Sequence, residues 1–212
     1  FVDPEWCVCF DSDGKLNPLI TKRTLAAALK PLQKAVIPGF YGADMNGHIH
    51  TFSRGGSDVT GSLAAAAIGA DLYENWTDVS GFMVTDPRIV PNPARIPILT
   101  YREMRELSYM GATVLHEDAI FPVRSAGIPI NIRNTNAPED AGTMIVGNDY
   151  DFSRESLSHT ITGIAGKKGF STINIEKAMM NNETGFGMKV LKVLYDNGLS
   201  FVELIQVLYY GT

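Results

Sequence analysis

The feature that most constrains the fold is a glycine-rich turn between a strand-like segment and a helix-like segment. Ser53-Arg54-Gly55-Gly56-Ser57-Asp58 follows an alternating, β-prone run at residues 47–52 and precedes an alanine-rich run at residues 59–68. The first run predicts a strand and the second predicts a helix. Glycines let backbone amides approach a ligand closely, and a helix N-terminus favours an anion. The order therefore predicts a phosphate-handling loop, with Arg54 and Asp58 as its charged side chains.

The same turn also has a purely structural interpretation. Gly55 and Gly56 can form a plain tight turn, and Ser57 or Asp58 can act as a helix N-cap, which contributes about 1 kcal/mol. The loop sequence alone is consistent with both interpretations, so other motifs in the chain are needed to distinguish them.

Composition limits the class of protein. Of the 212 residues, 45% are hydrophobic and 19% are charged, which suits one large globular domain or two smaller ones. The net charge is −5 and no Lys/Arg cluster is present, so we expect no nucleic-acid partner. No apolar run approaches the roughly 20 residues of a membrane span, and no signal peptide is visible. We therefore expect a soluble, cytoplasmic protein without a membrane partner.

The cysteines and histidines do not predict a metal site. Cys7 and Cys9 lie two residues apart on one face of a possible strand, without Cys or His neighbours, so neither a disulfide nor a zinc site is expected. His48 and His50 alternate in the same way, and a two-histidine metal pair lacks a third ligand. We predict no metal site built from protein ligands alone.

Periodicity and turn residues predict most of the remaining elements. We expect strands at residues 5–10, 35–40, 71–76, 128–134 and 143–146, a hairpin around Asn46-Gly47, and helices at residues 19–32, 99–108 and 114–124. Thr100 and Glu103 predict a capping box. The strand–helix–strand order around the glycine loop predicts a parallel α/β sheet, whose ligands bind beyond the carboxyl ends of the strands. Thr77-Asp78 would lie at that edge, near the glycine loop.

The C-terminal part has a different pattern. Residues 147–158 are polar and rich in Ser and Asp, which is typical of a linker. After it, strands at residues 160–163, 171–176 and 201–205 and a helix at residues 186–195 predict a small module. We therefore expect two domains, at residues 1–147 and 148–212.

Four motifs follow one another in the order and spacing of aspartate kinases: Ser53–Asp58, Trp76-Thr77-Asp78-Val79, Thr85-Asp86-Pro87-Arg88 and Leu115-His116. The chain resembles the C-terminal half of the kinase domain in that family, and its tail resembles the start of an ACT regulatory domain. The resemblance implies a partial three-layer α/β/α sandwich of the amino acid kinase type. It also implies transfer of the γ-phosphoryl group of ATP, with Mg²⁺, to the β-carboxylate of L-aspartate, the entry to lysine, threonine, methionine and isoleucine synthesis.

The resemblance implies roles for individual residues. Arg54 and Asp58 would be catalytic, and Arg54, Ser57 and Asp58 would bind the substrate. The nucleotide site would comprise Gly55, Gly56, Ser57, Thr77, Asp78, Met83, Arg88, Thr113 and Val114. Met83 stands where relatives often carry tyrosine, and Thr113 where many carry lysine. Adenine stacking and phosphate binding would be weaker at these two positions.

The ACT-like tail implies an amino acid effector, with lysine as the first expectation and threonine as the second. Its site would comprise Met180, Glu183, Thr184, Gly185, Phe186, Phe201, Val202 and Glu203. A loop that leads into a helix N-terminus suits an effector carboxylate. Alternatively, Gly185 and Gly187 only shape a turn and Phe186 packs in a core. ACT domains usually pair across subunits, so a homodimer or higher homo-oligomer is expected.

One family motif does not occur in these residues. The Lys-Phe-Gly-Gly-Ser/Thr loop, whose lysine stabilises the transferred phosphoryl group, is absent from the 212 residues. We therefore expect this chain alone not to phosphorylate aspartate. Two alternatives stay open: another kinase of the same fold, acting on glutamate or a nucleotide, and a non-catalytic regulatory fragment that binds an effector.

Overall fold

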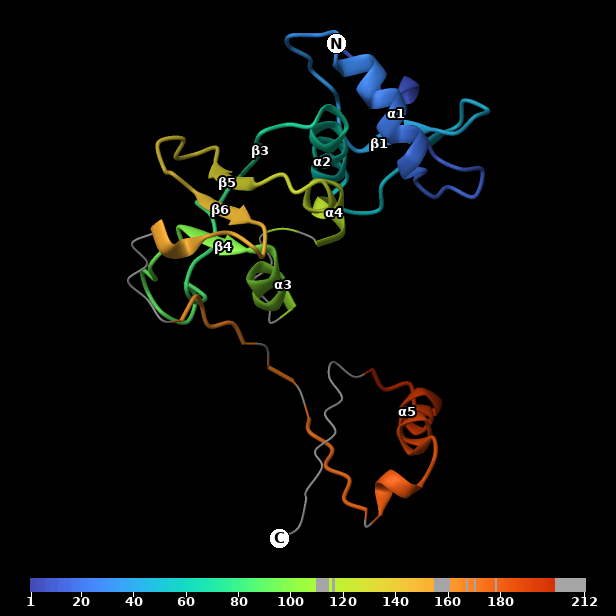
Figure 1. Cartoon of the computed structure of the whole chain (residues 1–212), viewed down its shortest axis with the longest axis vertical. Coiled ribbons are helices and arrows are strands. Elements are labelled where there is room, and N and C mark those ends of the chain that lie inside the picture. Colours follow the sequence, from blue (N-terminus) through green and yellow to red (C-terminus); the bar gives the residue numbers. More distant parts are fainter. Residues whose placement is uncertain are drawn as a thin grey trace. The chain divides into compact units, whose positions relative to one another are not determined.

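The computed structural model describes residues 1–109, 115, 117–154, 161–166, 168–169, 171–177 and 179–200. Contacts divide the chain into two compact units, Phe1–Lys168 and Gly169–Thr212 (Figure 1). No helix within the described ranges is long and apolar enough to cross a membrane.

The first unit alternates helices and short strands. Its elements are η1 (Pro4–Trp6), α1 (Pro18–Leu29), β1 (Tyr41–Ala43), β2 (Ile49–Thr51), α2 (Gly56–Ile68), β3 (Tyr73–Thr77), β4 (Ile98–Thr100), α3 (Tyr101–Tyr109), α4 (Glu117–Ser125), β5 (Ile130–Asn134), β6 (Thr143–Val146) and η2 (Phe152–Arg154). The expected α/β class is confirmed.

The strands that the structure describes form two sheets, and the larger sheet is mixed. Its order is β3-β5-β6-β4, in which β3 pairs with β5 and β4 with β6 in parallel, while β5 and β6 are antiparallel. The expected parallel pairing is found for β3 with β5 and for β4 with β6, but the strand before the glycine loop, β2, does not join β3 in this sheet as expected. Because the Asn46-Gly47 hairpin forms as predicted, β2 pairs locally with β1 in a separate antiparallel sheet.

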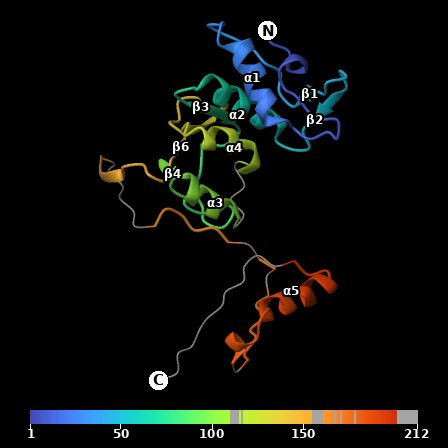
Figure 2. The same cartoon turned by 45° about the vertical axis from the view of Figure 1, so that its right-hand side comes forward.

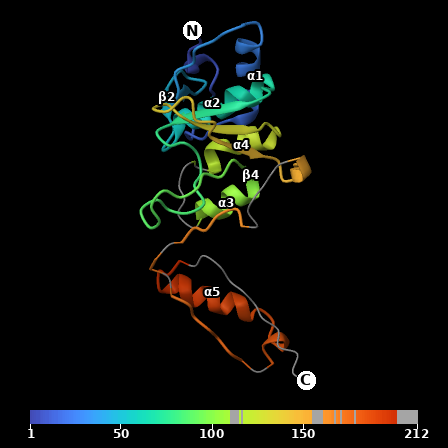
Figure 3. The same cartoon turned by 90° about the vertical axis from the view of Figure 1, so that its left-hand side faces the viewer.

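Helix α2 is buried on more than one side, which explains its alanine-rich sequence. Figures 2 and 3 show α2 between α1 and α4. Leu63 and Ala67 belong to a buried cluster with Leu25 of α1, whereas Ala65 belongs to the cluster that covers the mixed sheet. Small side chains let the neighbouring helices α1 and α4 approach α2 closely, which fixes the position of α2 between them.

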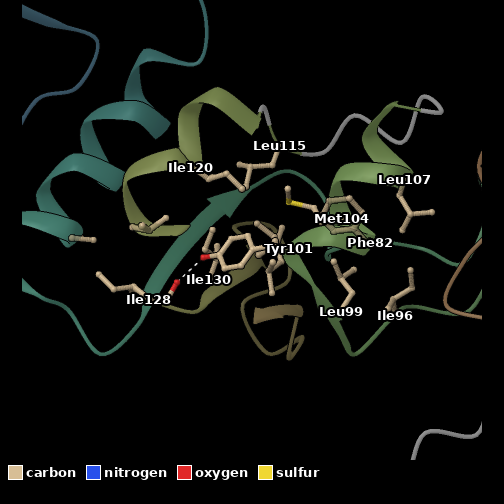
Figure 4. Close-up of a cluster of buried hydrophobic side chains, with 14 residues drawn as sticks. Phe82, Ile96, Leu99, Tyr101, Met104, Leu107, Leu115, Ile120, Ile128 and Ile130 are labelled. Atoms are coloured by element: carbon tan, nitrogen blue, oxygen red, sulfur yellow. Dashed lines mark hydrogen bonds between the residues drawn. The ribbon is translucent and has the colours of Figure 1, made fainter. Parts of the chain in front are cut away.

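The main core lies between the mixed sheet and its helices. Met104 of α3 and Ile120 of α4 pack in one cluster with Ile130 and other apolar side chains, each of which contributes about 1.5–3 kcal/mol on burial (Figure 4). Tyr101 lies inside this cluster and donates a hydrogen bond of 2.6 Å to the carbonyl oxygen of Ile128. Burial raises the pKa of Tyr101 to about 12, so the hydroxyl remains a neutral donor.

The predicted capping box forms at the start of α3. The Glu103 carboxylate accepts hydrogen bonds of 2.8 Å from both the backbone N–H and the hydroxyl of Thr100, and the Glu103 N–H donates to Thr100 Oγ1. The hydroxyl of Thr162 donates to the second carboxylate oxygen at 2.5 Å. Burial alone would raise the pKa of Glu103, but the hydrogen bonds from Thr162 and Thr100 outweigh it and lower that pKa.

Glu103→Gln is expected to reduce the free energy of unfolding by about 1 kcal/mol at pH 7, because charge-assisted hydrogen bonds to a partly exposed carboxylate are lost. The folded-state pKa lies below the ordinary value of 4.5, so this stabilisation is complete above that value. It disappears as the pH falls through the folded-state pKa. Urea unfolding between pH 7 and pH 3 measures it, with the exposed Glu106→Gln on the same helix as control. A deficit that is independent of pH would contradict this account.

Several predicted elements differ from the structure. The strand expected at residues 5–10 is replaced by η1, because the Asp3 side chain accepts a hydrogen bond from the Glu5 N–H and Pro4 favours a helical start. No strand forms at residues 35–40, where Pro38 lacks an N–H donor. Helix α1 ends at Leu29, just before the Lys30-Pro31 step that disfavours helix. The three-residue strand β4 was missed, since β6, the strand with which it pairs in the described part of the chain, is remote in sequence.

The second unit contains η3 (Met180–Asn182) and α5 (Phe186–Asp196), and the latter confirms the expected helix. The strands expected at residues 160–163 and 171–176 do not form at the described positions 161–163 and 171–176. A strand needs a hydrogen-bonding neighbour, and the third expected strand, residues 201–205, lies outside the described residues.

The unit boundary falls after the predicted linker. Thr162 bonds to Glu103, and the Ile164 N–H donates to the Val84 carbonyl oxygen at 2.7 Å, so these residues belong to the first unit. The functional division at residues 147 and 148 stays a prediction.

Candidate functional site

The glycine loop presents an uncapped helix N-terminus. Gly55 is the N-cap residue in a left-handed conformation with φ of 61°, and no side chain of a described residue caps α2. The first N–H groups of a helix have no intrahelical partner. Those of Gly56, Ser57 and Asp58 also find no acceptor among the residues that the structure describes. The interpretation of Ser57 or Asp58 as the N-cap was therefore wrong, and the amides are available to an anion.

The turn is held against the helix by Phe40. This residue has a φ of 85°, which is strained for a bulky side chain. The Phe40 N–H donates to the buried Thr60 hydroxyl at 3.2 Å, and that hydroxyl donates to the Gly56 carbonyl oxygen at 2.8 Å. The Phe52 N–H donates to the Phe40 carbonyl oxygen at 3.0 Å. Segments before and after the hairpin are thereby fastened to the first turn of α2.

The two charged side chains of the loop differ in their surroundings. Arg54 is exposed and forms no ion pair with any other described residue. The Asp58 carboxylate is half-buried, and its Oδ1 accepts a hydrogen bond of 2.9 Å from Asn75 Nδ2 in β3. The loop therefore combines free amides, a free cation and a carboxylate that is tied to the sheet.

The same contact brings the end of β3 to the loop. Asn75 lies two residues before Thr77, the last residue of β3. The Thr77 carbonyl oxygen accepts hydrogen bonds of 2.8 Å from both the N–H and the hydroxyl of Thr135, and the Thr77 hydroxyl donates to Asp78 Oδ1 at 3.2 Å. A ligand beyond the carboxyl end of β3 would thus meet the N-terminus of α2, as the sequence predicts.

Comparison with known proteins is consistent with this geometry. The model of the amino acid kinase family matches residues 5–134. The chain belongs to this family. Its relatives include aspartokinase 3 of Bacillus subtilis, which is 46% identical over 166 residues, covering 78% of this chain and 36% of the relative.

Solved structures of aspartate kinases resemble this amino acid kinase chain. The enzyme from Clostridium acetobutylicum has a TM-score of 0.86 and 53% identity, covering 98% of this chain and 47% of that one. E. coli aspartokinase III in complex with aspartate and ADP has a TM-score of 0.62 and 29% identity, covering 71% and 35%. The structure of the same E. coli enzyme in complex with lysine and aspartate has a TM-score of 0.65 and 25% identity, and the match covers 97% of this chain and 46% of that one. The chain spans less than half the length of these relatives.

The remaining nucleotide-site candidates of this amino acid kinase chain are not joined to the glycine loop by a hydrogen bond or ion pair among the described residues. The Arg88 side chain is 84% exposed, and its guanidinium forms an ion pair with the Asp86 carboxylate, with Nη2 2.6 Å from Oδ2. This hydrogen bond lowers the pKa of Asp86 and raises that of Arg88. Met83 forms an isolated bridge with Arg95. Thr113 and Val114 lie outside the described residues.

The effector candidates that the structure describes lie just before α5 and at its first residue. Gly185 is its N-cap residue, with φ of 76° and no capping side chain. Glu183 pairs with Lys177 and, at 2.5 Å, with Lys189. Lys177 also lies 5.0 Å from the centre of the Phe186 ring, and no described residue of α5 is buried. The structure therefore does not support packing of Phe186 in a core. Phe201, Val202 and Glu203 lie outside the described residues.

A further polar cluster and a cavity contain no residue of the glycine loop. Oδ2 of Asp44 lies 3.2 Å from Nδ1 of His48 and 3.4 Å from Nε2 of His50. Within the described part of the chain, no group of three or more His, Cys, Asp or Glu side chains can hold a metal ion. A cavity of about 460 Å³ does not include the glycine loop; its lining residues are Cys9, Phe10, Asp11, Ser12, Ile20, Asp44, Met45 and Asn46. Cys7 and Cys9 are free thiols, as predicted.

Sequence reasoning missed the residues that support the loop: Phe40, Thr60, Tyr73 and Asn75. The sequence does contain one signal for Asn75. Asparagine is depleted in strands, and Asn75 occupies the inward-facing position of the alternating run at residues 73–77. Phe40 and Thr60 left none, since their contacts join parts of the chain that are distant in sequence.

Proposed function

We propose that this chain is the part of an aspartate kinase that binds the nucleotide phosphates and L-aspartate. The reaction is transfer of the γ-phosphoryl group of ATP to the β-carboxylate. One observation carries the proposal: the uncapped first turn of α2 stands beside the anchored Asp58 and beside Arg54, which has no ion-pair partner among the described residues. The similarity to E. coli aspartokinase III, which was solved with aspartate and ADP, supports it.

The residues present fit a magnesium nucleotide. Backbone N–H groups at a helix N-terminus suit phosphate oxygens, and a carboxylate oxygen is the ligand type that Mg²⁺ prefers. In the described part of the chain, Asp58 Oδ1 has a partner whereas Oδ2 has none, so one oxygen is available to a cation. Mg²⁺ would supply neutralisation of phosphate charge when bound.

The chain contributes positioning and charge neutralisation. Two anions must meet in this reaction, so catalysis depends on fixed donors and cations rather than on covalent chemistry. In our proposal Arg54 binds a carboxylate of aspartate with its guanidinium fork, together with Ser57. Gly55, Gly56 and Ser57 donate backbone N–H groups to the phosphates, and Asp58 orients the cationic groups.

Further nucleotide contacts follow from the same proposal. Thr77 and Asp78 contact the adenosine part, and Met83 lies near it. Arg88, whose exposed guanidinium is paired with Asp86, binds phosphate oxygens. Thr113 and Val114 complete the set.

The regulatory part of the proposal concerns residues 148–212. We assign to them an incomplete ACT-like module that binds an amino acid effector at Met180, Glu183, Thr184, Gly185, Phe186, Phe201, Val202 and Glu203. Lysine is the first candidate, supported by the lysine complex of E. coli aspartokinase III, and threonine is the second. Pairing of such modules would make the protein a homodimer or higher homo-oligomer.

Isothermal titration calorimetry tests the substrate assignment. The chain, in the presence of Mg·ADP, is titrated with L-aspartate and separately with L-glutamate. We expect aspartate to bind, and Arg54→Ala to weaken its binding at least about 10-fold, because a charge-assisted bidentate contact is lost. The exposed Arg102→Ala in α3 serves as the matched control and should leave binding unchanged.

Each contrary outcome identifies an alternative. Stronger binding of glutamate would favour another kinase of the same fold. Heat from lysine or threonine without any from Mg·ADP or aspartate would favour a regulatory fragment that is not catalytic.

A further inference from the structure

We propose that Asn75 is a positioning residue that acts together with Tyr73 to hold the Asp58 carboxylate in one orientation, with Oδ1 occupied and Oδ2 available to a cation. This proposal rests on the proposed function, since it specifies how one member of that site is prepared. Asn75 and Tyr73 both lie in β3 and belong to none of the four motifs found in the sequence.

Three hydrogen bonds close a ring between β3 and α2. Asn75 Nδ2 donates to Asp58 Oδ1 at 2.9 Å and to the Tyr73 hydroxyl at 3.2 Å. The Tyr73 hydroxyl in turn donates to the backbone carbonyl oxygen of Asp58 at 3.3 Å. Both the side chain and the backbone of Asp58 are thereby fixed by neighbouring residues of one strand.

The surroundings restrict this ring to its observed arrangement. Asn75 is only 7% exposed, and a buried carboxamide is costly unless its N–H groups find acceptors. The Tyr73 ring lies against Gly61 of α2, where a Cβ atom would come within 2.8 Å of the tyrosine oxygen. Burial raises the pKa of Tyr73, although the Asn75 hydrogen bond opposes the shift, so the hydroxyl stays protonated and can donate.

The arrangement has a chemical consequence. A carboxylate has two oxygens, and a side chain that is free to rotate presents either one to a ligand. Asn75 occupies Oδ1 as a donor, and the part of the chain that the structure describes offers no partner to Oδ2. Because a carboxylate held this way loses less rotational freedom when it binds, Asn75 should increase the affinity for a magnesium nucleotide through Asp58 alone.

A double-mutant cycle tests this coupling on the whole chain. The variants are Asn75→Leu, Asp58→Ala and the double variant, and the probe is Mg·ADP in calorimetry. We expect Asn75→Leu to weaken binding about 3- to 10-fold, as for the loss of one hydrogen bond to a charged group, and to have no further effect when Asp58 is already alanine. Asn17→Ala, which removes the N-cap of α1, is the control for general loss of stability and should not change the affinity.

Equal weakening by Asn75→Leu in both backgrounds, or no weakening at all, would overturn the proposal. A second measurement is independent of nucleotide binding. In ¹⁵N NMR spectra, the carboxamide signals of Asn75 should shift and exchange faster with water in Asp58→Ala than in the parent chain. Unchanged carboxamide signals would overturn the proposal even if Mg·ADP binds. A parent chain that fails to bind Mg·ADP, but shows this spectral coupling, would contradict the proposed nucleotide site and support the Asn75–Asp58 contact.

Discussion

Gly56→Ala is expected to reduce the free energy of unfolding by about 3 kcal/mol and to abolish Mg·ADP binding. A Cβ atom at this position would lie 2.6 Å from Cδ2 of Phe40, 2.8 Å from Cβ of Phe52 and 3.0 Å from Cα of Phe40. Two of these atoms are backbone or next to it, so a rotamer change cannot relieve the overlap. The first turn of α2 must move away from both segments, and its N–H groups lose their common direction.

Urea unfolding and calorimetry with Mg·ADP measure the two effects. The matched control is Gly187→Ala, a substitution in the first turn of α5 where a Cβ atom meets nothing within 4 Å. That substitution should be neutral or slightly stabilising, because alanine has the higher helix propensity. A Gly56→Ala chain with the parent stability and the parent affinity would contradict the close packing of this turn.

Gly142→Ala is the second substitution with a large expected effect, a loss of about 3 kcal/mol or more in unfolding free energy. Gly142 precedes β6 with φ of 75°, a conformation that costs an alanine about 1–2 kcal/mol. Its Cβ would also lie 2.0 Å from the carbonyl oxygen of Ile132 and 2.8 Å from Oδ1 of Asn131. The central antiparallel pair of the mixed sheet would have to separate to admit it.

Gly127→Ala separates the cost of the left-handed conformation from the cost of steric overlap. Gly127 has nearly the same conformation, with φ of 69°, but its Cβ would meet nothing within 4 Å. This control should lose only the conformational part, about 1–2 kcal/mol. Thermal or urea unfolding of both variants compares them directly, and equal losses would mean that the contact with β5 is not as close as described.

Local signals were sufficient for several parts of the first unit. The capping box of Thr100 and Glu103 and the hairpin at Asn46-Gly47 depend on residues a few positions apart, and both form as predicted. The helix after the glycine loop also forms where the alanine-rich run predicts it. Interactions of this kind are encoded in short segments, so they can be identified without knowledge of the remaining chain.

Predictions that needed distant partners were less successful. The apolar segments at residues 5–10 and 35–40 have β-like composition, yet neither becomes a regular strand. The three-residue strand β4 does form because β6 lies beside it. Whether a short apolar segment becomes a strand depends on which neighbour supplies its hydrogen bonds, and composition carries no information about that neighbour.

The glycine loop illustrates both sides of this division. From the sequence alone, Arg54, two glycines, a serine and Asp58 before a helix predicted an anion-binding turn, with a plain capped turn as the alternative, because these properties belong to the residues themselves and to the helix dipole. Only the tertiary structure decided that no side chain of the described residues caps α2 and that Asn75 donates a hydrogen bond to Asp58. The contact between Asn75 and Asp58 joins β3 to α2. The distance between these two elements is set by how the whole core packs, which a short stretch of sequence does not encode.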